Sequence, residues 1–216
     1  MRDRFVLTAL AVLLLLLPGC GSRVSRIQSE STILDPALGL TVLPVHTPGP
    51  AWIEDIVEDA AGCAASAVAK VPKARLVKTE EFRRYVFPDQ TDEVPLTREL
   101  FRALGRDAEF QRRATAAGIR YIVGAGGTTK QPSPRSTCTS GGCLFVWERE
   151  STAWAEVIDV TRGDSVAIIN AAVSGRPFLL LSSIPMGAPS FTETWACHKL
   201  KRGLAEFLTA RRDHRP

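Results

Sequence analysis

The sequence has no hydrophobic run long enough to cross a membrane as a helix. Its longest apolar stretch, from Phe5 to Leu17, has 13 residues. At about 1.5 Å per residue, such a helix would be roughly 20 Å long, whereas the hydrocarbon core of a bilayer is about 30 Å thick. The sequence therefore excludes a permanent span by this segment.

A strong excess of one charge is also missing. The 27 Lys and Arg residues against 23 Asp and Glu give a formal net charge of +4. Domains that bind nucleic acid carry a larger and more localised basic excess, so no nucleic-acid partner is expected. The basic C-terminal stretch, residues 199–216, is interpreted as the solvated face of a last helix followed by a tail, with contact to anionic lipid or glycan as the alternative.

The N-terminus contains the features of a cleavable export signal. Two basic residues, Arg2 and Arg4, precede the apolar run, and the breakers Pro18 and Gly19 follow it. This order is typical of a signal peptide.

The segment Leu17-Pro18-Gly19-Cys20 resembles the lipobox of bacterial lipoproteins. The resemblance implies that residues 1–19 are removed and that Cys20 is acylated, with palmitate as one of the chains. Two acyl chains anchor a protein stably where one does not, since each buried CH₂ contributes about 0.8 kcal/mol. An ordinary secretory signal with a chance cysteine is the alternative. In having a glycine, Gly21, directly after the anchor, the sequence resembles outer-membrane lipoproteins. The expected location is therefore the cell envelope, on the periplasmic side of the outer membrane.

Four further cysteines remain in a chain that the signal directs to an oxidising compartment, and an even number there predicts disulfides. Cys138 and Cys143 bracket four turn-forming residues, so a local bridge between them is geometrically easy. Cys63 and Cys197 are then left to each other, each on the apolar face of an expected helix. We predict these two bonds.

A zinc site is the competing interpretation of the cysteines, because His198 follows Cys197 and His46 lies elsewhere in the chain. The separation of Cys138 and Cys143 is wider than the close pairs of structural zinc sites, and no second pair accompanies it. We therefore expect no metal and no cofactor.

Two short motifs are similar to motifs found in enzymes. Gly163-Asp164-Ser165 is similar to the Gly-Asp-Ser signature of one esterase family, with Ser165 as the nucleophile, but here it lies between two expected strands, where Gly and Asp form turns. Asp213 and His214, the available partners, lie in the Arg-rich tail. The glycines at 124–127 lack the spacing of a dinucleotide fingerprint and indicate a bulge or kink in a strand. We expect no enzymatic activity, with a hydrolase as the alternative.

Periodicity places the regular elements along the chain. Strands are expected at 39–45, 73–79, 119–130, 143–149, 152–161 and 164–175. Helices are expected at 52–70, 79–86, 98–105, 107–118 and from a capping box of Ser190 with Glu193 to about 211. Thr97 is expected to cap the third of these helices, and the fourth is expected to have Asp107 near its start and Gly118 as its stop. Residues 131–142 are expected as a polar loop and 176–189 as an irregular apolar connection.

These elements predict an α/β fold, a single three-layer domain in which helices cover a mixed sheet of about five strands. The expected organisation is a signal peptide over residues 1–19, a lipidated flexible tether over 20–37, an envelope domain over 38–211 and a basic tail over 212–216. The mature chain of 197 residues suits one domain with its own core.

Several of these segments resemble the periplasmic domain shared by CsgG-like lipoproteins and the TolB N-terminal domain. The resemblance lies in "GLTVLPV", "ARLVKT", "GIRYIVGAG" and "VIDVTRGDSVA", followed by a closing amphipathic helix. It implies a non-catalytic binding or assembly module of the envelope with a protein partner. A structural lipoprotein that braces the envelope is a further alternative, and the sequence leaves the partner and the oligomeric state open.

Overall fold

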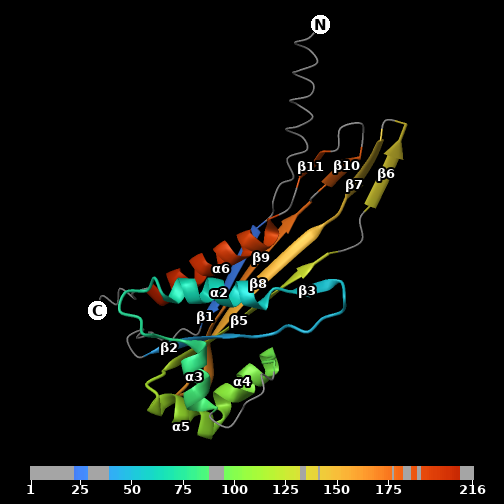
Figure 1. The fold of residues 1–216 in the computed structure, drawn as a ribbon. Helices are drawn as coiled ribbons and strands as arrows, with labels where there is room; N and C mark the ends of the chain where they lie inside the picture. The colour runs from blue at the N-terminus through green and yellow to red at the C-terminus, as the bar shows by residue number, and fades with distance from the viewer. Residues whose placement is uncertain are drawn as a thin grey trace.

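The structure is a computed structural model that describes residues 22–28, 39–87, 95–131, 135–140, 142–176, 178–181, 186–188 and 191–209. Within these residues a seven-stranded main sheet runs in the order β1-β9-β8-β5-β2-β4, with β3 paired to the end of β5 (Figure 1). The strands are β1 (Ser22–Gln28), β2 (Leu40–Pro44), β3 (Ile53–Asp55), β4 (Leu76–Val77), β5 (Tyr121–Lys130), β8 (Arg149–Asp159) and β9 (Asp164–Gly175). Strand β2 is parallel to β4 and β5, and the other pairs are antiparallel.

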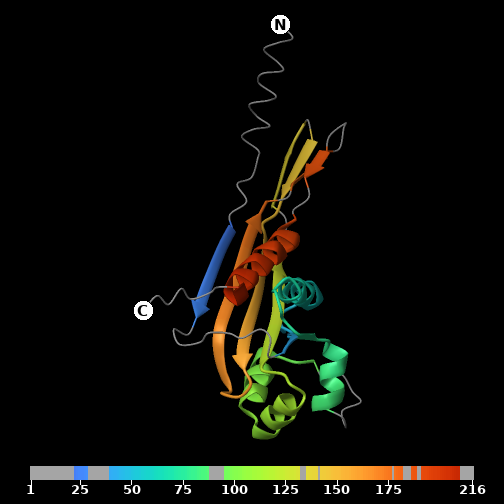
Figure 2. The ribbon, with the colours of Figure 1, turned by 90° about the vertical axis from the view of Figure 1, so that its left-hand side faces the viewer.

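A smaller sheet projects from one end of the main sheet, as Figures 1 and 2 both show. Its order is β11-β10-β7-β6. The strands are β6 (Arg135–Thr139), β7 (Gly142–Val146), β10 (Phe178–Leu181) and β11 (Met186–Ala188). The chain leaves the main sheet after β5 and after β9 to build it.

Helices cover both faces of the main sheet, because successive side chains of each strand point to opposite faces. Helices α2 (Val57–Val68) and α6 (Thr192–Thr209) pack on the face that Val123 and Ala155 share. Helices α3 (Thr79–Val86), α4 (Arg98–Arg106) and α5 (Ala108–Ala116) pack on the face of Ile122 and Ile158. The predicted α/β class with three layers is confirmed, and the sheets contain more strands than the five expected.

The predicted helix boundaries in this region follow from local capping. Thr97 Oγ1 accepts a hydrogen bond from Leu100 N at 3.4 Å, and Asp107 Oδ1 accepts one from Phe110 N at 2.7 Å. Each bond satisfies one of the amide groups that a helix start leaves without a partner. Gly118 ends α5 with a φ of +72°, a conformation that favours glycine. These three predictions are confirmed. The capping box at Ser190 lies outside the described residues.

The flexible-tether prediction is wrong for residues 22–28. They form β1, which pairs with β9 from Ser22 opposite Val173 to Gln28 opposite Ala167. The stretch is polar because an edge strand of a sheet buries only part of its surface, and the low content of core residues concealed it.

Three other expectations differ from the structure for related reasons. The expected helix from Trp52 begins at Val57, because Ile53–Asp55 pair with the end of β5. The loop expected over 131–142 contains β6, and the irregular connection expected over 176–189 contains β10 and β11. All of these are short strands outside the central part of the main sheet, where periodicity carries little signal.

The glycines at 124–127 do not make a bulge. Strand β5 pairs with β8 in unbroken register from Tyr121 to Lys130. A Cβ at Gly124 would lie 2.7 Å from the ring of Phe101, and one at Gly126 would collide with the carbonyl oxygen of Val45. The glycines are therefore needed because neighbouring groups approach the strand closely.

Candidate functional site

A groove of about 560 Å³ opens at the edge of the main sheet that lies opposite β1. It is bounded by β2, by the first half of α2 and by the start of α3. Its apolar lining includes Val42, Pro44, Ala61, Ala65, Leu76 and Leu96, and its polar lining includes His46, Glu58, Lys78, Thr79 and Glu80. The groove thus offers an apolar floor with charges of both signs around it.

The backbone of β2 at this edge is closed to a further strand. Leu40 N donates to Arg75 O, and His46 N donates to Leu96 O. The backbone N–H and C=O groups of the even-numbered residues therefore point toward this edge. The hydroxyl of Thr79 donates to Val42 O at 2.9 Å. Pro44 lies between them and has no N–H to offer. A partner in the groove would therefore be held by side-chain contacts, because strand addition has few backbone groups available.

One contact between a histidine and a carboxylate borders the groove. His46 Nδ1 and Asp55 Oδ2 lie 2.9 Å apart, both partly exposed, and they connect the segment after β2 to β3. A pair in this setting contributes little to stability, since exposed ion pairs are worth about 0–1 kcal/mol. Its effect is to fix the position of the imidazole beside the groove.

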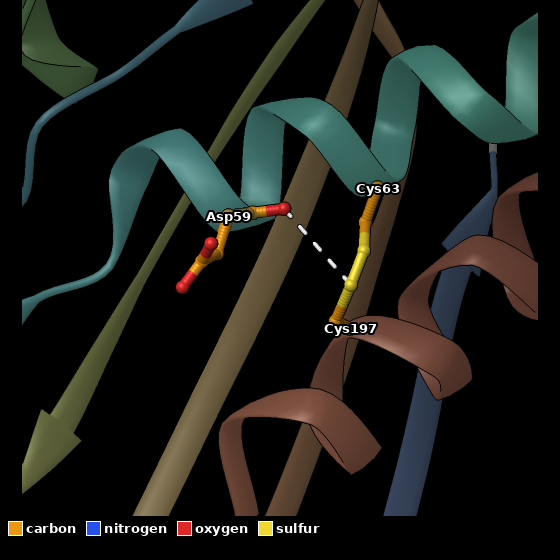
Figure 3. Close-up of a disulfide and its surroundings, with 3 residues drawn as sticks. All are labelled: Asp59, Cys63 and Cys197. Atoms are coloured by element: carbon orange, nitrogen blue, oxygen red, sulfur yellow. Dashed lines mark hydrogen bonds between the residues drawn. A yellow bond between two sulfur atoms is a disulfide. The ribbon is translucent and has the colours of Figure 1, made fainter.

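The helix that forms one wall of the groove is joined to α6 by a disulfide. Cys63 of α2 and Cys197 of α6 lie with their Cα atoms 5.7 Å apart, and Cys197 Sγ is 4.0 Å from the carbonyl oxygen of Asp59 (Figure 3). Both cysteines are partly buried where the two helices meet. The pair closes a separation of 134 residues, so it connects the first long helix to the last one.

The second cysteine pair lies in the small sheet. Cys138 of β6 is directly opposite Cys143 of β7, with 4.0 Å between their Cα atoms. Both pairs lie at disulfide distance in the pairing that the sequence predicts. The four-residue turn expected between Cys138 and Cys143 is a tighter hairpin, because Thr139 and Gly142 also pair.

A charged cluster on the opposite face of the sheet holds α4 in place. The carboxylate of Glu156 on β8 is 1% exposed and accepts hydrogen bonds from Arg102 Nε at 2.9 Å and from Arg98 Nε at 3.3 Å. This hydrogen bond from Arg102 to Glu156 is the main reason that the pKa of the Arg102 guanidinium is raised. Arg98 also lies over the ring of Trp154, 4.4 Å from its centre. We interpret the cluster as structural, because both arginines are engaged by one buried carboxylate.

Ser165 lies in an exposed position near the start of β9, opposite Ile158 of β8. Gly163 before it has a φ of +71°, which the turn between β8 and β9 requires. The described histidines lie elsewhere: His46 pairs with Asp55, and His198 is on the exposed side of α6. The structure does not bring Ser165 together with a described histidine. Asp213 and His214 lie outside the described residues.

In the part of the chain that the structure describes, no group of three or more His, Cys, Asp or Glu side chains is placed to hold a metal ion. The helices described above include none that is long and apolar enough to span a bilayer. Cys20, the expected anchor, lies outside the described residues, as does the basic tail over 212–216.

Neither the groove nor the Glu156 cluster was predicted from the sequence. A signal for the cluster was present, since Glu156 occupies an inward-facing position between Ala155 and Val157 in a strand, and a buried carboxylate needs partners. Arg98 and Arg102 are spaced so that both lie on one side of a helix. The groove had no such signal, because residues that are far apart in the sequence line it.

No family model matches this chain, and no curated protein matches it. Among solved structures it is similar to the PelC dodecamer from Paraburkholderia phytofirmans, with 14% identity over 89% of this chain and 100% of that chain and a TM-score of 0.46. A point-substituted variant of that PelC dodecamer, from the same organism, gives 14% identity, coverage of 88% and 100%, and a TM-score of 0.44. The hypothetical protein CT253 from Chlamydia trachomatis gives 12% identity, coverage of 64% and 71%, and a TM-score of 0.28.

Proposed function

We propose that the chain is a membrane-anchored envelope lipoprotein that acts as a non-catalytic binding or assembly module. The observation that carries the proposal is the groove between β2, α2 and α3, an accessible site with mixed lining. Its volume of about 560 Å³ lies within the usual range of ligand-binding clefts. An assembly role is also what the resemblance to CsgG-like and TolB N-terminal domains implies.

The chemistry of the groove favours a protein segment as the ligand. Apolar side chains from Val42, Ala61 and Leu76 would contact an apolar anchor residue, and charged groups at the rim would select its flanks. Lys78 is basic whereas Glu58 and Glu80 are acidic, so a strongly charged polymer of either sign would meet repulsion.

Membrane attachment is the second part of the proposal. Strand β1 begins at Ser22 and pairs with β9 at the edge of the sheet that lies opposite the groove. An acyl group on Cys20 would therefore hold the domain by one edge and leave the groove at the other edge open to a partner.

The experiment uses a substitution that fills the groove without disturbing the helix. Gly62 of α2 lines the groove, and a Cβ at this position meets no atom within 4 Å. Gly62→Trp would occupy the space that the partner needs, whereas Gly62→Ala would leave most of it open. A photo-crosslinking residue at Ala61 in intact cells would report the partner, with Ala116 on the exposed side of α5 as the control position.

We expect a crosslinked product from Ala61 that is absent from Ala116, lost in Gly62→Trp and retained in Gly62→Ala. If Ala61 and Ala116 give the same products, or if Gly62→Trp leaves the product from Ala61 unchanged, the groove is not the binding site.

A further inference from the structure

Ser22, the first described residue after the expected anchor, has a fixed place in the main sheet. Ser22 pairs with Val173, Val173 with Ser151, and Ser151 with Thr129. These four residues form one row across the main sheet. The row lies near the start of β8, which follows β7 of the small sheet, and Figure 2 shows the small sheet projecting from one end of the main sheet. Cys20 precedes Ser22 by two residues, and two residues span at most about 7 Å. Any lipid on Cys20 must therefore lie close to this row.

The start of α6 is held at the same row by buried hydrogen bonds. The hydroxyls of Thr129 and Ser151 lie 2.9 Å apart, and Ser151 Oγ donates to Thr192 Oγ1 at 2.7 Å. Glu193 forms an ion pair with Arg149, the first residue of β8. The first turn of α6 is thus fixed beside the end of the sheet at which the chain departs for Cys20.

Two aromatic side chains lie exposed on this turn. Phe191 is 63% exposed and Trp195 is 49% exposed, and Trp195 N donates to Phe191 O at 3.0 Å. Side chains of a helix lean toward its N-terminus, and for α6 this is the direction of the row. A single exposed aromatic residue is ordinary, whereas adjacent Phe and Trp side chains next to an acylation site match the aromatic residues that lie at membrane interfaces.

We propose that the surface where β1 and α6 begin faces the bilayer, with Phe191 and Trp195 seated in the lipid interface beside the acylated Cys20. The proposal rests on the membrane attachment proposed above and adds which end of the domain contacts lipid. The acyl chains and the aromatic side chains would strengthen each other's binding. Once the acyl chains hold the domain at the bilayer, contact of the aromatic side chains with lipid costs little additional entropy. The domain is then oriented on the membrane rather than free to rotate about its anchor.

The test measures the contact of one tryptophan with lipid. The full chain, purified in detergent, is reconstituted into phosphatidylethanolamine and phosphatidylglycerol vesicles whose acyl chains carry bromine, which quenches tryptophan fluorescence on contact. The chain has four tryptophans, so the signal of Trp195 is the difference between the wild type and Trp195→Phe, which keeps an aromatic ring. Tyr85, 58% exposed on α3 at the far end of the sheet, offers the matched control: Tyr85→Trp in the Trp195→Phe background moves the reporter away from the row.

We expect brominated lipid to quench the wild-type fluorescence, Trp195→Phe to lose at least about half of that quenching, and Tyr85→Trp to restore emission that lipid does not quench. In chains that also carry Cys20→Ser, the double change Phe191→Ser and Trp195→Ser should lower the bound fraction in vesicle flotation about tenfold, a loss of about 1.4 kcal/mol.

Quenching that Trp195→Phe leaves unchanged, or equal quenching of a tryptophan at position 85, would refute the orientation. If Trp195 is instead buried in a dimer that forms without lipid, Phe191 and Trp195 contact a second copy of the chain, and the proposed orientation is also refuted. The anchor is judged separately by acyl labelling of Cys20. If the chain takes up label but Trp195 is not quenched, the anchor is supported and the orientation is refuted. If Cys20→Ser takes up no label but is still quenched, the orientation is supported independently of the anchor.

Discussion

At the scale of single residues, two glycines illustrate opposite packing environments. Gly124 lies under the ring of Phe101, which is fully buried, whereas Gly62 borders open space. The change from Gly to Ala reduces the freedom of the unfolded chain to the same extent at both positions, so a comparison isolates the effect of packing.

We expect Gly124→Ala to lower the free energy of unfolding by about 1–3 kcal/mol, because the new methyl group displaces the Phe101 ring. Gly62→Ala should raise it by about 0.5–1 kcal/mol through helix propensity. Denaturant titration of both variants measures the difference. Equal effects at the two sites would contradict the close packing of β5 against α4.

The buried carboxylate of Glu156 gives a second prediction. When Arg98 and Arg102 are both changed to alanine, the carboxylate stays buried without its partners, and we expect a loss of about 3–5 kcal/mol. Adding Glu156→Gln removes the charge and should recover a large part of this loss. Thermal melts of the double and triple variants at pH 7 provide the test, and a triple variant no more stable than the double one would show that the arginines act through other contacts.

Ser165 provides a test of the enzyme alternative. Its hydroxyl is exposed beside a turn that depends on Gly163, so we expect Ser165→Ala to leave both the melting temperature and the biological phenotype unchanged. A reactive-serine probe applied to the wild-type protein should not label this residue. Labelling, or a lost phenotype with unchanged stability, would support the hydrolase.

The sequence predicted individual residues well where the physical cause was local. Thr97, Asp107 and Gly118 act within one helical turn, so neighbouring residues reveal their roles. The need for glycine at position 124 could not be predicted, because it depends on the ring of Phe101, which packs against β5 from helix α4. Local sequence suggested a bulge, and the tertiary contact gives the glycine a different role.

At the scale of elements, the cysteine pairs differ most in the length of chain that each one closes. Cys63 and Cys197 are 134 residues apart, and Cys138 and Cys143 are 5 apart. On the chain-entropy model the first bond stabilises the fold by about 5 kcal/mol and the second by about 2 kcal/mol. Alanine at both 63 and 197 should therefore lower the melting temperature much more than alanine at both 138 and 143.

Peptide mapping under non-reducing conditions checks the pairing itself. A peptide that joins Cys63 to Cys138 or Cys143 would contradict the contact between α2 and α6, because that contact brings Cys63 to Cys197. An equal loss of stability in the two alanine pairs would contradict the loop-length argument while leaving the pairing intact.

The sequence predicted long elements and missed short ones. The strands β5, β8 and β9 were identified because they are long and largely buried, and the helices α3 to α5 because burial of one face imposes a helical period on the sequence. Strand β1 was missed because its polar residues occupy the edge of the sheet, and β6 because a stretch rich in Ser and Thr with prolines before it also suits a loop. Edge strands obtain their stability from the partner strand, which a local pattern does not reveal.

At the scale of the whole molecule, the proposed anchor and the groove lie at opposite edges of the main sheet. The edge at β1 leads to Cys20, and the edge at β2 and β4 borders the groove. Because helices cover both faces of the main sheet, its edges are the parts that stay accessible to other molecules. Such an arrangement suits a protein that is held by one side and binds with the other.

The central claim is that Cys20 holds the protein in a membrane, and labelling with palmitate followed by fractionation tests it most directly. The full chain and Cys20→Ser are expressed in a bacterial host that processes lipoproteins, with Cys138→Ala in the Cys143→Ala background as a control that removes the less stabilising cysteine pair and leaves the anchor intact. The account predicts that the wild type and the control take up label and sediment with membranes, while Cys20→Ser takes up none and is released or keeps its signal. A wild-type chain without label, or a Cys20→Ser chain that stays in the membrane at the size of the mature protein, would contradict it.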